Sequence, residues 1–174
     1  MKNVLIVEDF QPMAKALKAL LEGSGHQVTC VAGAQSYQVT DGGVILVGLT
    51  EGGQTEEVDC RQFQIAFVDG QLEGNMQGPA FVALLVQSKV ACCGTSCQTD
   101  LNSEMLAQGA TIAAKKPVVF CALLSQRLSA DAVLAPTQVE KLQLADIESN
   151  FCNPEFQALS DQADAIIMSY LPRH

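Results

Sequence analysis

The strongest constraint on the fold is a set of short, strongly apolar runs that alternate with stretches of helical periodicity. The run 4–7 (VLIV) is the clearest of them. A run that is apolar at every position fits a strand buried on both faces of a sheet, because a half-exposed strand would alternate with polar residues. Further strands are expected over 27–31, 63–68, 90–93 and 111–114.

Helical signals fill the gaps between these runs. Pro12 suits the first turn of a helix, and apolar residues follow it at helical spacing until Gly23. Other helices are expected from Gly78, around 101–106 and over 118–128. Strands that alternate with helices of about ten residues indicate βαβ units. The sequence therefore predicts an α/β fold with a five-stranded parallel sheet.

Polar residues follow four of the five expected strands, at the point where each strand ends. They are Glu8 and Asp9, then Asp69, then Thr95 and Ser96, and last Lys116. In an open parallel sheet the ligand crevice lies at the carboxyl ends of the strands. We therefore expect three carboxylates, a hydroxyl and an ammonium group on one rim of the sheet.

This set of groups points to the chemistry of phosphate. Crowded carboxylates repel one another and raise each other's pKa unless a cation lies between them. Mg²⁺ suits such a site, because it prefers one or two carboxylates together with water and phosphate oxygens. A carboxylate can also attack phosphorus, and an ammonium group and a hydroxyl can then bind the phosphoryl oxygens. The rim therefore predicts Mg²⁺-dependent phosphoryl transfer.

Four motifs, in this order, resemble the receiver domain of bacterial two-component response regulators. They are VLIVEDF at 4–10, FVDG at 67–70, GTS at 94–96 and AKKP at 114–117. The resemblance implies a doubly wound, flavodoxin-like fold. It also implies a signalling protein, not a classical enzyme, which accepts a phosphoryl group from a sensor histidine kinase or a phosphotransfer protein. The output would then be contact with a downstream protein partner.

The resemblance also implies roles for individual residues. Asp69 would be the phosphoacceptor. Glu8 and Asp9 would hold Mg²⁺, and Asp69 and the backbone carbonyl of Gln71 would complete the metal site. Lys116 would bind the phosphoryl oxygens.

The switch hydroxyl and its aromatic partner depart from the family pattern. Thr95 would be the hydroxyl that turns toward the phosphoryl group, although Gly94 fits the usual spacing to Lys116 best and Ser96 fits it least. The position three before Lys116 usually carries an aromatic residue that couples to this hydroxyl. Here that position is Ala113, so the aromatic relay is missing or works differently.

The segment 37–60 is longer than the family usually shows between its second and third strands. It holds the apolar run 44–47 (VILV) between the turn-forming stretches DGG at 41–43 and EGG at 51–53. We expect an inserted strand or hairpin there, followed by a shortened helix near 56–61. The insertion is expected to give a surface specific to this protein's partner.

We place the receiver at 1–132 and a helical C-terminal extension at 133–174. Thr137 and Glu140 have the spacing of a capping box, and Asn153-Pro154 is a second helix start. Apolar residues then recur at three- and four-residue steps between 156 and 170. The pattern leaves two alternatives open: the tail packs back on the receiver, or its apolar stripe docks a partner or forms a homodimer.

Composition excludes several classes of function. Ten basic residues stand against nineteen acidic ones, so the net charge of −9 argues against direct nucleic-acid binding, which needs a positive field. No apolar stretch approaches the roughly 18 residues of a membrane span, and the N-terminal run is cut off too early for a signal peptide. The seven cysteines are expected to be reduced and mostly buried, which fits a cytoplasmic protein.

Two other functions stay open at this point. A pseudo-receiver, an interaction module that is not phosphorylated, is favoured by Ala113, but such modules usually lose at least one of the acidic or lysine positions that this chain retains. A phosphatase that forms an aspartyl phosphate is less consistent with the sequence. Such enzymes usually show a DxD pattern after the first strand, where this chain has Glu8-Asp9.

Overall fold

A five-stranded parallel sheet forms the centre of the molecule, which confirms the prediction from the apolar runs. The computed structural model describes residues 1–50, 52–73 and 76–172. The strands lie in the order β2-β1-β6-β7-β8. Their bounds are β1 (Asn3–Val7), β2 (Gln27–Val31), β6 (Ile65–Asp69), β7 (Ala91–Thr95) and β8 (Ile112–Ala114). The chain leaves β1 first toward one edge and then toward the other, as in a doubly wound sheet.

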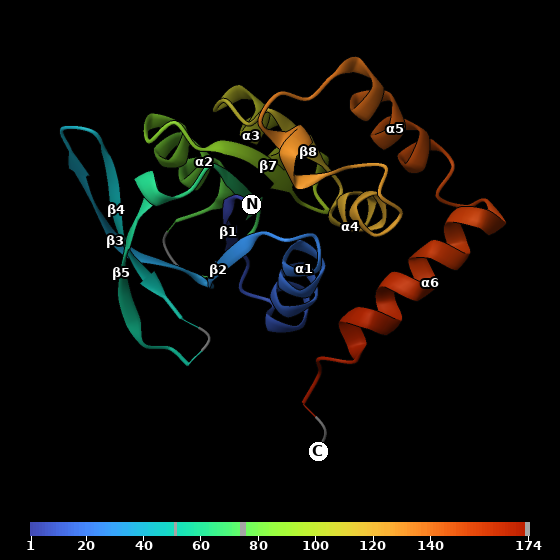
Figure 1. Cartoon of the computed structure of the whole chain (residues 1–174), viewed down its shortest axis with the longest axis horizontal. Helices are drawn as coiled ribbons and strands as arrows, with labels where there is room; N and C mark the ends of the chain where they lie inside the picture. Colours follow the sequence, from blue (N-terminus) through green and yellow to red (C-terminus); the bar gives the residue numbers. More distant parts are fainter. Residues whose placement is uncertain (51, 74–75, 173–174) are drawn as a thin grey trace.

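Helices cover both faces of this sheet (Figure 1). They are α1 (Gln11–Gly23), α2 (Gly78–Gln87), α3 (Thr99–Ala107) and α4 (Lys116–Leu124). Ile6 of β1 lies in the hydrophobic cluster shared with α1 and α4, whereas its neighbour Leu5 lies in the cluster shared with α2 and with Met105 of α3. Successive residues of β1 thus face opposite layers, which explains why the run is apolar at every position.

The last of these helices is shorter than the sequence indicated. We expected a helix over 118–128, but α4 begins at Lys116 and ends at Leu124. Gln126 has a φ of 59°, which a continuing helix does not allow. Because α4 begins at Lys116 itself, this lysine belongs to the helix start and not to the preceding strand end.

The inserted segment forms a second, antiparallel sheet. Its strands lie in the order β3-β4-β5, with β3 (Gly33–Thr40), β4 (Gly43–Leu49) and β5 (Thr55–Asp59). A short 3-10 turn, Cys60–Gln62, leads from it into β6. In the expected turn at 51–53, Glu51 lies outside the described residues.

The expected short helix near 56–61 is wrong. Residues 55–59 instead pair with β4 as β5, so the insertion is three strands and not one strand or a hairpin. Val44 and Leu46 of β4 and Val58 of β5 are buried together with Leu5 of β1. The apolar run of β4 needs a partner strand on each side, and β5 supplies the second one. The three-stranded sheet therefore covers the part of the main sheet where a helix was expected.

The C-terminal extension folds as two helices, α5 (Gln138–Ser149) and α6 (Pro154–Met168). The expected capping box is present, with Thr137 and Glu140 bonded reciprocally at the start of α5. α5 packs on α4, and α6 packs on both α4 and α1 (Figure 1). Phe156 and Ile167 lie in the same hydrophobic cluster as α1 and α4. The first alternative thus describes this tail: it packs back on α1 and α4, beside the central sheet. The division at 132/133 stays a prediction.

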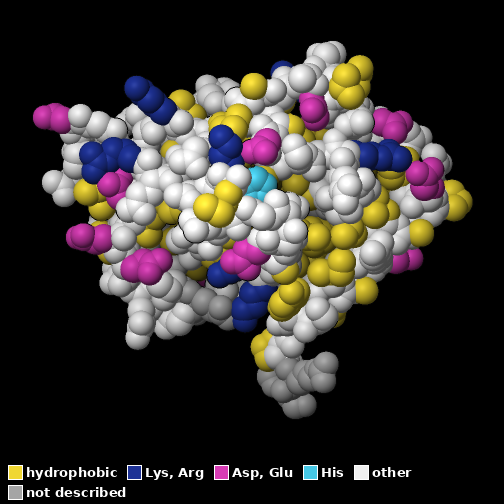
Figure 2. All heavy atoms as spheres, in the orientation of Figure 1, with side chains coloured by type: hydrophobic (Ala, Val, Ile, Leu, Met, Phe, Trp, Pro, Cys, Tyr) yellow, Lys and Arg dark blue, Asp and Glu magenta, His cyan; other side chains and the backbone are white. Residues whose placement is uncertain are grey.

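The surface of the molecule carries mixed charges. In Figure 2, acidic and basic side chains are scattered over the visible face, and hydrophobic side chains gather toward the side formed by α6. Met168 and Tyr170 are among the exposed apolar residues at that end of the chain. Within the described residues, no helix is both long and apolar enough to cross a membrane.

Candidate functional site

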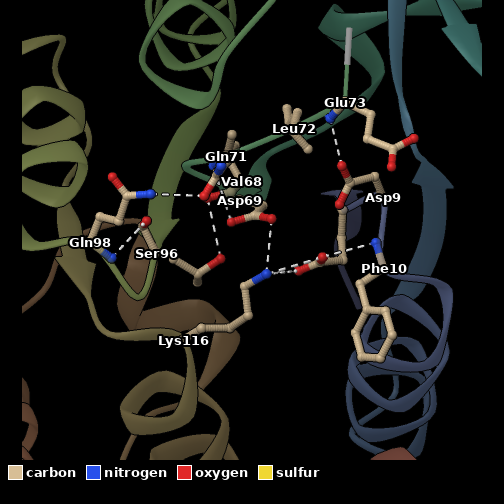
Figure 3. A network of polar contacts seen from close by, with 12 residues as sticks. Asp9, Phe10, Val68, Asp69, Gln71, Leu72, Glu73, Ser96, Gln98 and Lys116 are labelled. Atoms are coloured by element: carbon tan, nitrogen blue, oxygen red, sulfur yellow. Dashed lines mark hydrogen bonds and ion pairs between the residues drawn. The ribbon is translucent and has the colours of Figure 1, made fainter.

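The polar residues expected on one rim of the sheet do meet there. Asp69 is the last residue of β6, and Glu8 and Asp9 come directly after β1. Lys116 begins α4, and its side chain points back across the rim toward the acids (Figure 3). The acids lie at the carboxyl ends of β1 and β6, and Lys116 begins the helix that follows β8, so the fold alone brings them to one edge.

The three carboxylates form one cluster. Glu8, Asp9 and Asp69 each offer an oxygen, and these oxygens all lie within 4.8 Å of one another. Glu8 is 2% exposed and Asp69 is 5% exposed, whereas Asp9 is partly exposed. Two buried acids and a third at the mouth of the site leave the cluster open to solvent on one side.

Lys116 holds the two buried acids together. Its Nζ lies 2.9 Å from Asp69 Oδ2 and 2.8 Å from Glu8 Oε2. Burial on its own would lower the pKa of this lysine, but Glu8 and Asp69 outweigh burial and raise it above its ordinary value. The ammonium group therefore stays charged and partly neutralises the cluster.

One ammonium group does not neutralise three carboxylates. Burial, followed by the nearby charge of Asp69, raises the pKa of Glu8 to about 7, although Lys116 opposes this shift. A carboxyl group with such a pKa is costly to ionise without a further cation. The donor set, three carboxylate oxygens at bridging distance, fits a hard divalent ion such as Mg²⁺.

The loop after β6 closes one side of the site. Asp9 Oδ2 accepts a hydrogen bond of 2.6 Å from the backbone N–H of Glu73, and Asp69 Oδ1 accepts one of 3.3 Å from the N–H of Gln71. The side chain of Gln71 accepts a further bond from Gln98 Nε2 at 2.8 Å. The loop is therefore tied to the segments that follow β1 and β7 (Figure 3).

Between these groups lies a cavity of about 370 Å³. Its lining residues are Asp9, Asp69, Gln71, Leu72, Glu73, Ser96, Cys97, Gln98 and Lys116. Glu8 lies behind this lining, bonded through Oε1 to the backbone N–H of Phe10 at 3.1 Å. The cavity has the size and polarity to admit a phosphate-sized group beside Asp69 and Lys116.

The two candidate hydroxyls lie differently. Thr95 Oγ1 donates to the carbonyl oxygen of Val68 at 3.3 Å, and Thr95 is not among the residues that line the cavity. Ser96 lines it, and its Oγ accepts a bond from the N–H of Gln98 at 3.1 Å. Thr95 must therefore break its bond to Val68 before it can reach a group on Asp69, whereas Ser96 already faces the cavity.

Ala113 packs closely against Gly94 of β7, at the position where the resemblance implies an aromatic residue. A Cβ placed on Gly94 would lie 3.1 Å from the Cβ of Ala113 and 2.9 Å from Sδ of Met105. Met105 and Ala113 thus occupy the layer beneath the end of β7. The methyl group of Ala113 is too short to follow the motion of a switch hydroxyl. Whether the aromatic relay is missing or works differently stays a prediction.

Sequence reasoning missed part of the site. Gln98 and Glu73 were not singled out, because they lie in loops whose path no periodic pattern fixes. The cysteines were expected to be mostly buried, but Cys97 is exposed and lines the cavity. The one available signal was position, since these residues lie in the loops that follow β6 and β7, at the same edge of the sheet as the acids and the lysine.

Comparison with solved structures identifies the fold. A two-component response regulator from Clostridium difficile is 12% identical, with 79% of this chain and 99% of that chain covered and a TM-score of 0.53. NtrX from Brucella abortus is 16% identical, with 87% of this chain and 30% of that chain covered and a TM-score of 0.51. A CheY-like receiver domain protein from Methanospirillum hungatei is 16% identical, covers 86% of this chain and 98% of that chain, and has a TM-score of 0.48.

Comparison of the sequence gives nothing further. No family model matches the chain, and no curated protein matches it. At these identities the likeness to response regulator receivers is one of fold, and the site must be argued from its own geometry.

Proposed function

From its receiver fold, we propose that this chain is a signalling protein that accepts a phosphoryl group on Asp69 in a Mg²⁺-dependent reaction. The observation that carries the proposal is the meeting of Glu8, Asp9, Asp69 and Lys116 at one rim, with the carboxylate oxygens within 4.8 Å of one another. The donor would be a phosphohistidine on a sensor histidine kinase or a phosphotransfer protein. The output would be contact with a downstream protein partner in the cytoplasm, without direct binding of nucleic acid.

The reaction is a displacement at phosphorus. An oxygen of Asp69 attacks, the bond between phosphorus and the donor histidine nitrogen breaks, and the electron pair of that bond returns to the imidazole. Lys116 Nζ, now 2.9 Å from Asp69 Oδ2, moves its hydrogen bonds onto the phosphoryl oxygens. Ser96 or Thr95 supplies a hydroxyl to the same oxygens.

Glu8, Asp9 and Asp69 would hold Mg²⁺, together with the backbone carbonyl of Gln71. The ion would supply positive charge against the transferring phosphoryl group and favour the ionised form of Glu8. Asp9 is the most exposed of the three acids, and its bond to the Glu73 N–H would exchange for the metal.

A pseudo-receiver is the second candidate. Ala113 provides no aromatic relay, and the Thr95 hydroxyl is engaged with Val68. Such a module would keep the fold and its partner contacts but would never carry a phosphoryl group.

A homodimer through the C-terminal helices stays a prediction. The stripe proposed for it is largely buried within the chain, with Phe156 and Ile167 in the core.

The decisive experiment is incubation with acetyl phosphate and Mg²⁺, followed by intact-mass analysis. We expect a mass increase of one phosphoryl group, which chelation of Mg²⁺ prevents and the substitution Asp69→Asn abolishes. Asp41→Asn is the matched control, because Asp41 is an exposed acid in the turn between β3 and β4 and should leave the adduct unchanged. An adduct that survives Asp69→Asn would refute the assignment of Asp69. If the parent chain gains no mass from acetyl phosphate and binds no Mg²⁺, the pseudo-receiver is favoured.

A further inference from the structure

The inserted sheet has two unlike edges. β5, at one edge, carries Glu56, Glu57 and Asp59. β3, at the other edge, has no charged residue from Gly33 to Thr40. Proteins protect the open edges of sheets with charges, because unpaired backbone groups there attract another strand. β5 is protected in this way and β3 is not.

The side chains of β3 are also exposed to an unusual extent. Every residue from Gln35 to Val39 is exposed, with Tyr37 at 49% and Val39 at 59%. Tyr37 and Val39 are two positions apart, so they lie on the same face of the strand. Figure 1 shows this sheet on the side of the molecule opposite α6. β3 therefore presents an uncharged strip, with the apolar Tyr37 and Val39 on one face, which the described part of the chain leaves exposed.

At Tyr37 and Val39, the backbone N–H and C=O groups of β3 point away from β4, toward the open edge of the sheet. Val39 pairs with Val44 of β4, but the N–H of Val44 bonds to Ser88 Oγ at 2.8 Å and not to β3. The pair is therefore of the non-hydrogen-bonded kind, in which the N–H and C=O groups of both residues point away from each other. The pair of Tyr37 with Leu46, two residues along, repeats this arrangement. The outer edge of β3 thus presents the backbone groups of Tyr37 and Val39.

A groove of about 400 Å³ lies beside the N-terminal half of the strand. It is lined by Ala34, Gln35, Ser36, Tyr37, Met76 and Ala80, none of which is charged. The groove provides room for side chains of an added strand next to the open backbone edge. Main-chain bonds and a neighbouring groove for side chains are the two requirements of strand addition.

We propose that β3 pairs antiparallel with β3 of a second copy of this chain, about a two-fold axis at Tyr37, to form a continuous six-stranded sheet. The chain carries a net charge of −9, so most of its surface repels another copy, whereas β3 is uncharged. Asp41 directly follows β3 in the chain, and in this pairing the two Asp41 side chains lie at opposite ends, about 25 Å apart. At physiological salt, that distance exceeds the Debye length of about 8 Å, so their repulsion is screened.

The test is the molar mass of the full chain in solution, measured by sedimentation velocity from low micromolar to several hundred micromolar protein. We expect a shift from the 18.5 kDa monomer toward twice that mass with rising concentration. Val39→Pro should keep the protein monomeric. Proline removes an N–H that points to the open edge and that β4 does not use, so the fold should survive.

Glu57→Pro is the matched control. Glu57 pairs with Val47, whose backbone groups face β3 by the same alternation, so the Glu57 N–H points to the outer edge of β5. This variant should dimerise like the parent chain. Tyr37→Lys, which places two like charges opposite each other at the axis, is a second variant in case Val39→Pro unfolds.

Two results would overturn the proposal. One is a chain that stays monomeric over the whole concentration range. The other is a dimer that Val39→Pro and Tyr37→Lys both leave intact, since the contact would then use a different surface, such as Val139 and Leu142 on α5. Amide hydrogen exchange gives an independent readout: protection of Tyr37 and Val39 should rise with protein concentration.

Discussion

At the scale of single residues, the position of Asp69 depends on Gly78. The N–H of Gly78 bonds to the carbonyl of Gly70 at 3.1 Å, so the start of α2 lies directly against the end of β6. A Cβ on Gly78 would lie 2.2 Å from the carbonyl oxygen of Asp69 and 2.6 Å from Cα of Gly70. Both neighbours are backbone atoms, which cannot rotate away as a flexible side chain would. Glycine is therefore required at position 78 because neighbouring backbone atoms leave no room for a Cβ, and not because of a positive φ.

Gly78→Ala should lower the free energy of unfolding by about 1–3 kcal/mol, because the overpacked backbone must shift. It should also slow phosphorylation by acetyl phosphate, because the shift moves Asp69. Urea unfolding and the rate of adduct formation measure the two effects. Gly23→Ala is the control: no atom lies within 4 Å of its Cβ, so its stability should be unchanged or higher by up to about 1 kcal/mol. Equal stability of the two variants would contradict this account of Gly78.

The raised pKa of Glu8 makes stability depend on pH. In the folded chain this pKa is about 7 against an ordinary value of 4.5, so between these values the folded state binds a proton that the unfolded state releases. Stability without divalent ions should therefore fall as the pH rises from about 5 to about 7, by about 1–3 kcal/mol. Urea unfolding in chelator at several pH values measures this fall.

Added Mg²⁺ should reduce that pH dependence, because a metal ion beside Glu8 favours its ionised form. The comparison is made on the same protein, with Mg²⁺ replacing chelator at each pH. Parallel curves under the two conditions would argue against a metal site at these carboxylates, whatever the absolute stability.

At the scale of elements, the sequence predicts those strands and helices whose hydrophobic residues recur with a clear period. The strand runs and the residues at their ends were sufficient to place Glu8, Asp9, Asp69 and Lys116 together, because strand direction dictates which ends meet. β5 was mistaken for a helix, since TEEVD has one apolar residue and too short a length for either period to show. The orientation of the Thr95 hydroxyl was also beyond reach, because it depends on the neighbouring Val68 carbonyl and not on any pattern along the chain.

The tail helix α6 is held mainly by its buried face. Phe156 is 5% exposed, and the guanidinium of Arg127 lies 5.0 Å from the centre of its ring. Phe156→Ala should destabilise the docking of α6 by about 3–5 kcal/mol, and limited proteolysis should then cleave the tail well before the rest of the chain. Met168→Ala is the control, because Met168 is 58% exposed. A proteolysis pattern unchanged in Phe156→Ala would show that other contacts hold the helix.

At the scale of the whole molecule, the exposure of each cysteine thiol distinguishes the two hydrophobic layers from the cavity wall. Cys92 and Cys93, neighbours on β7, lie in opposite clusters. Burial raises the pKa of Cys92 to about 12, and the thiols in these layers are shielded from reagents. Cys97 and Cys152 are the exposed thiols, and Cys97 lies in the wall of the cavity beside Asp69.

Iodoacetamide at pH 8 should therefore modify Cys97 and Cys152 in the native chain, and the buried thiols only after unfolding. The buried set is Cys60, Cys92, Cys93 and Cys121. Beryllofluoride with Mg²⁺ should slow the modification of Cys97 and leave Cys152 unaffected, because only Cys97 lines the cavity. Peptide mapping by mass spectrometry follows each site. Equal protection of both thiols would indicate a change spread over the molecule and not occupancy of this site.

The packing of α6 on α1 has a consequence for synthesis. Helix α1 is synthesised before α6, and its outer side is completed by residues near position 167. Until α6 emerges from the ribosome, the nascent chain exposes apolar surface on α1, which invites chaperone binding or aggregation. Burial of the outer side of α1 thus waits for the synthesis of α6, which follows that of the central sheet.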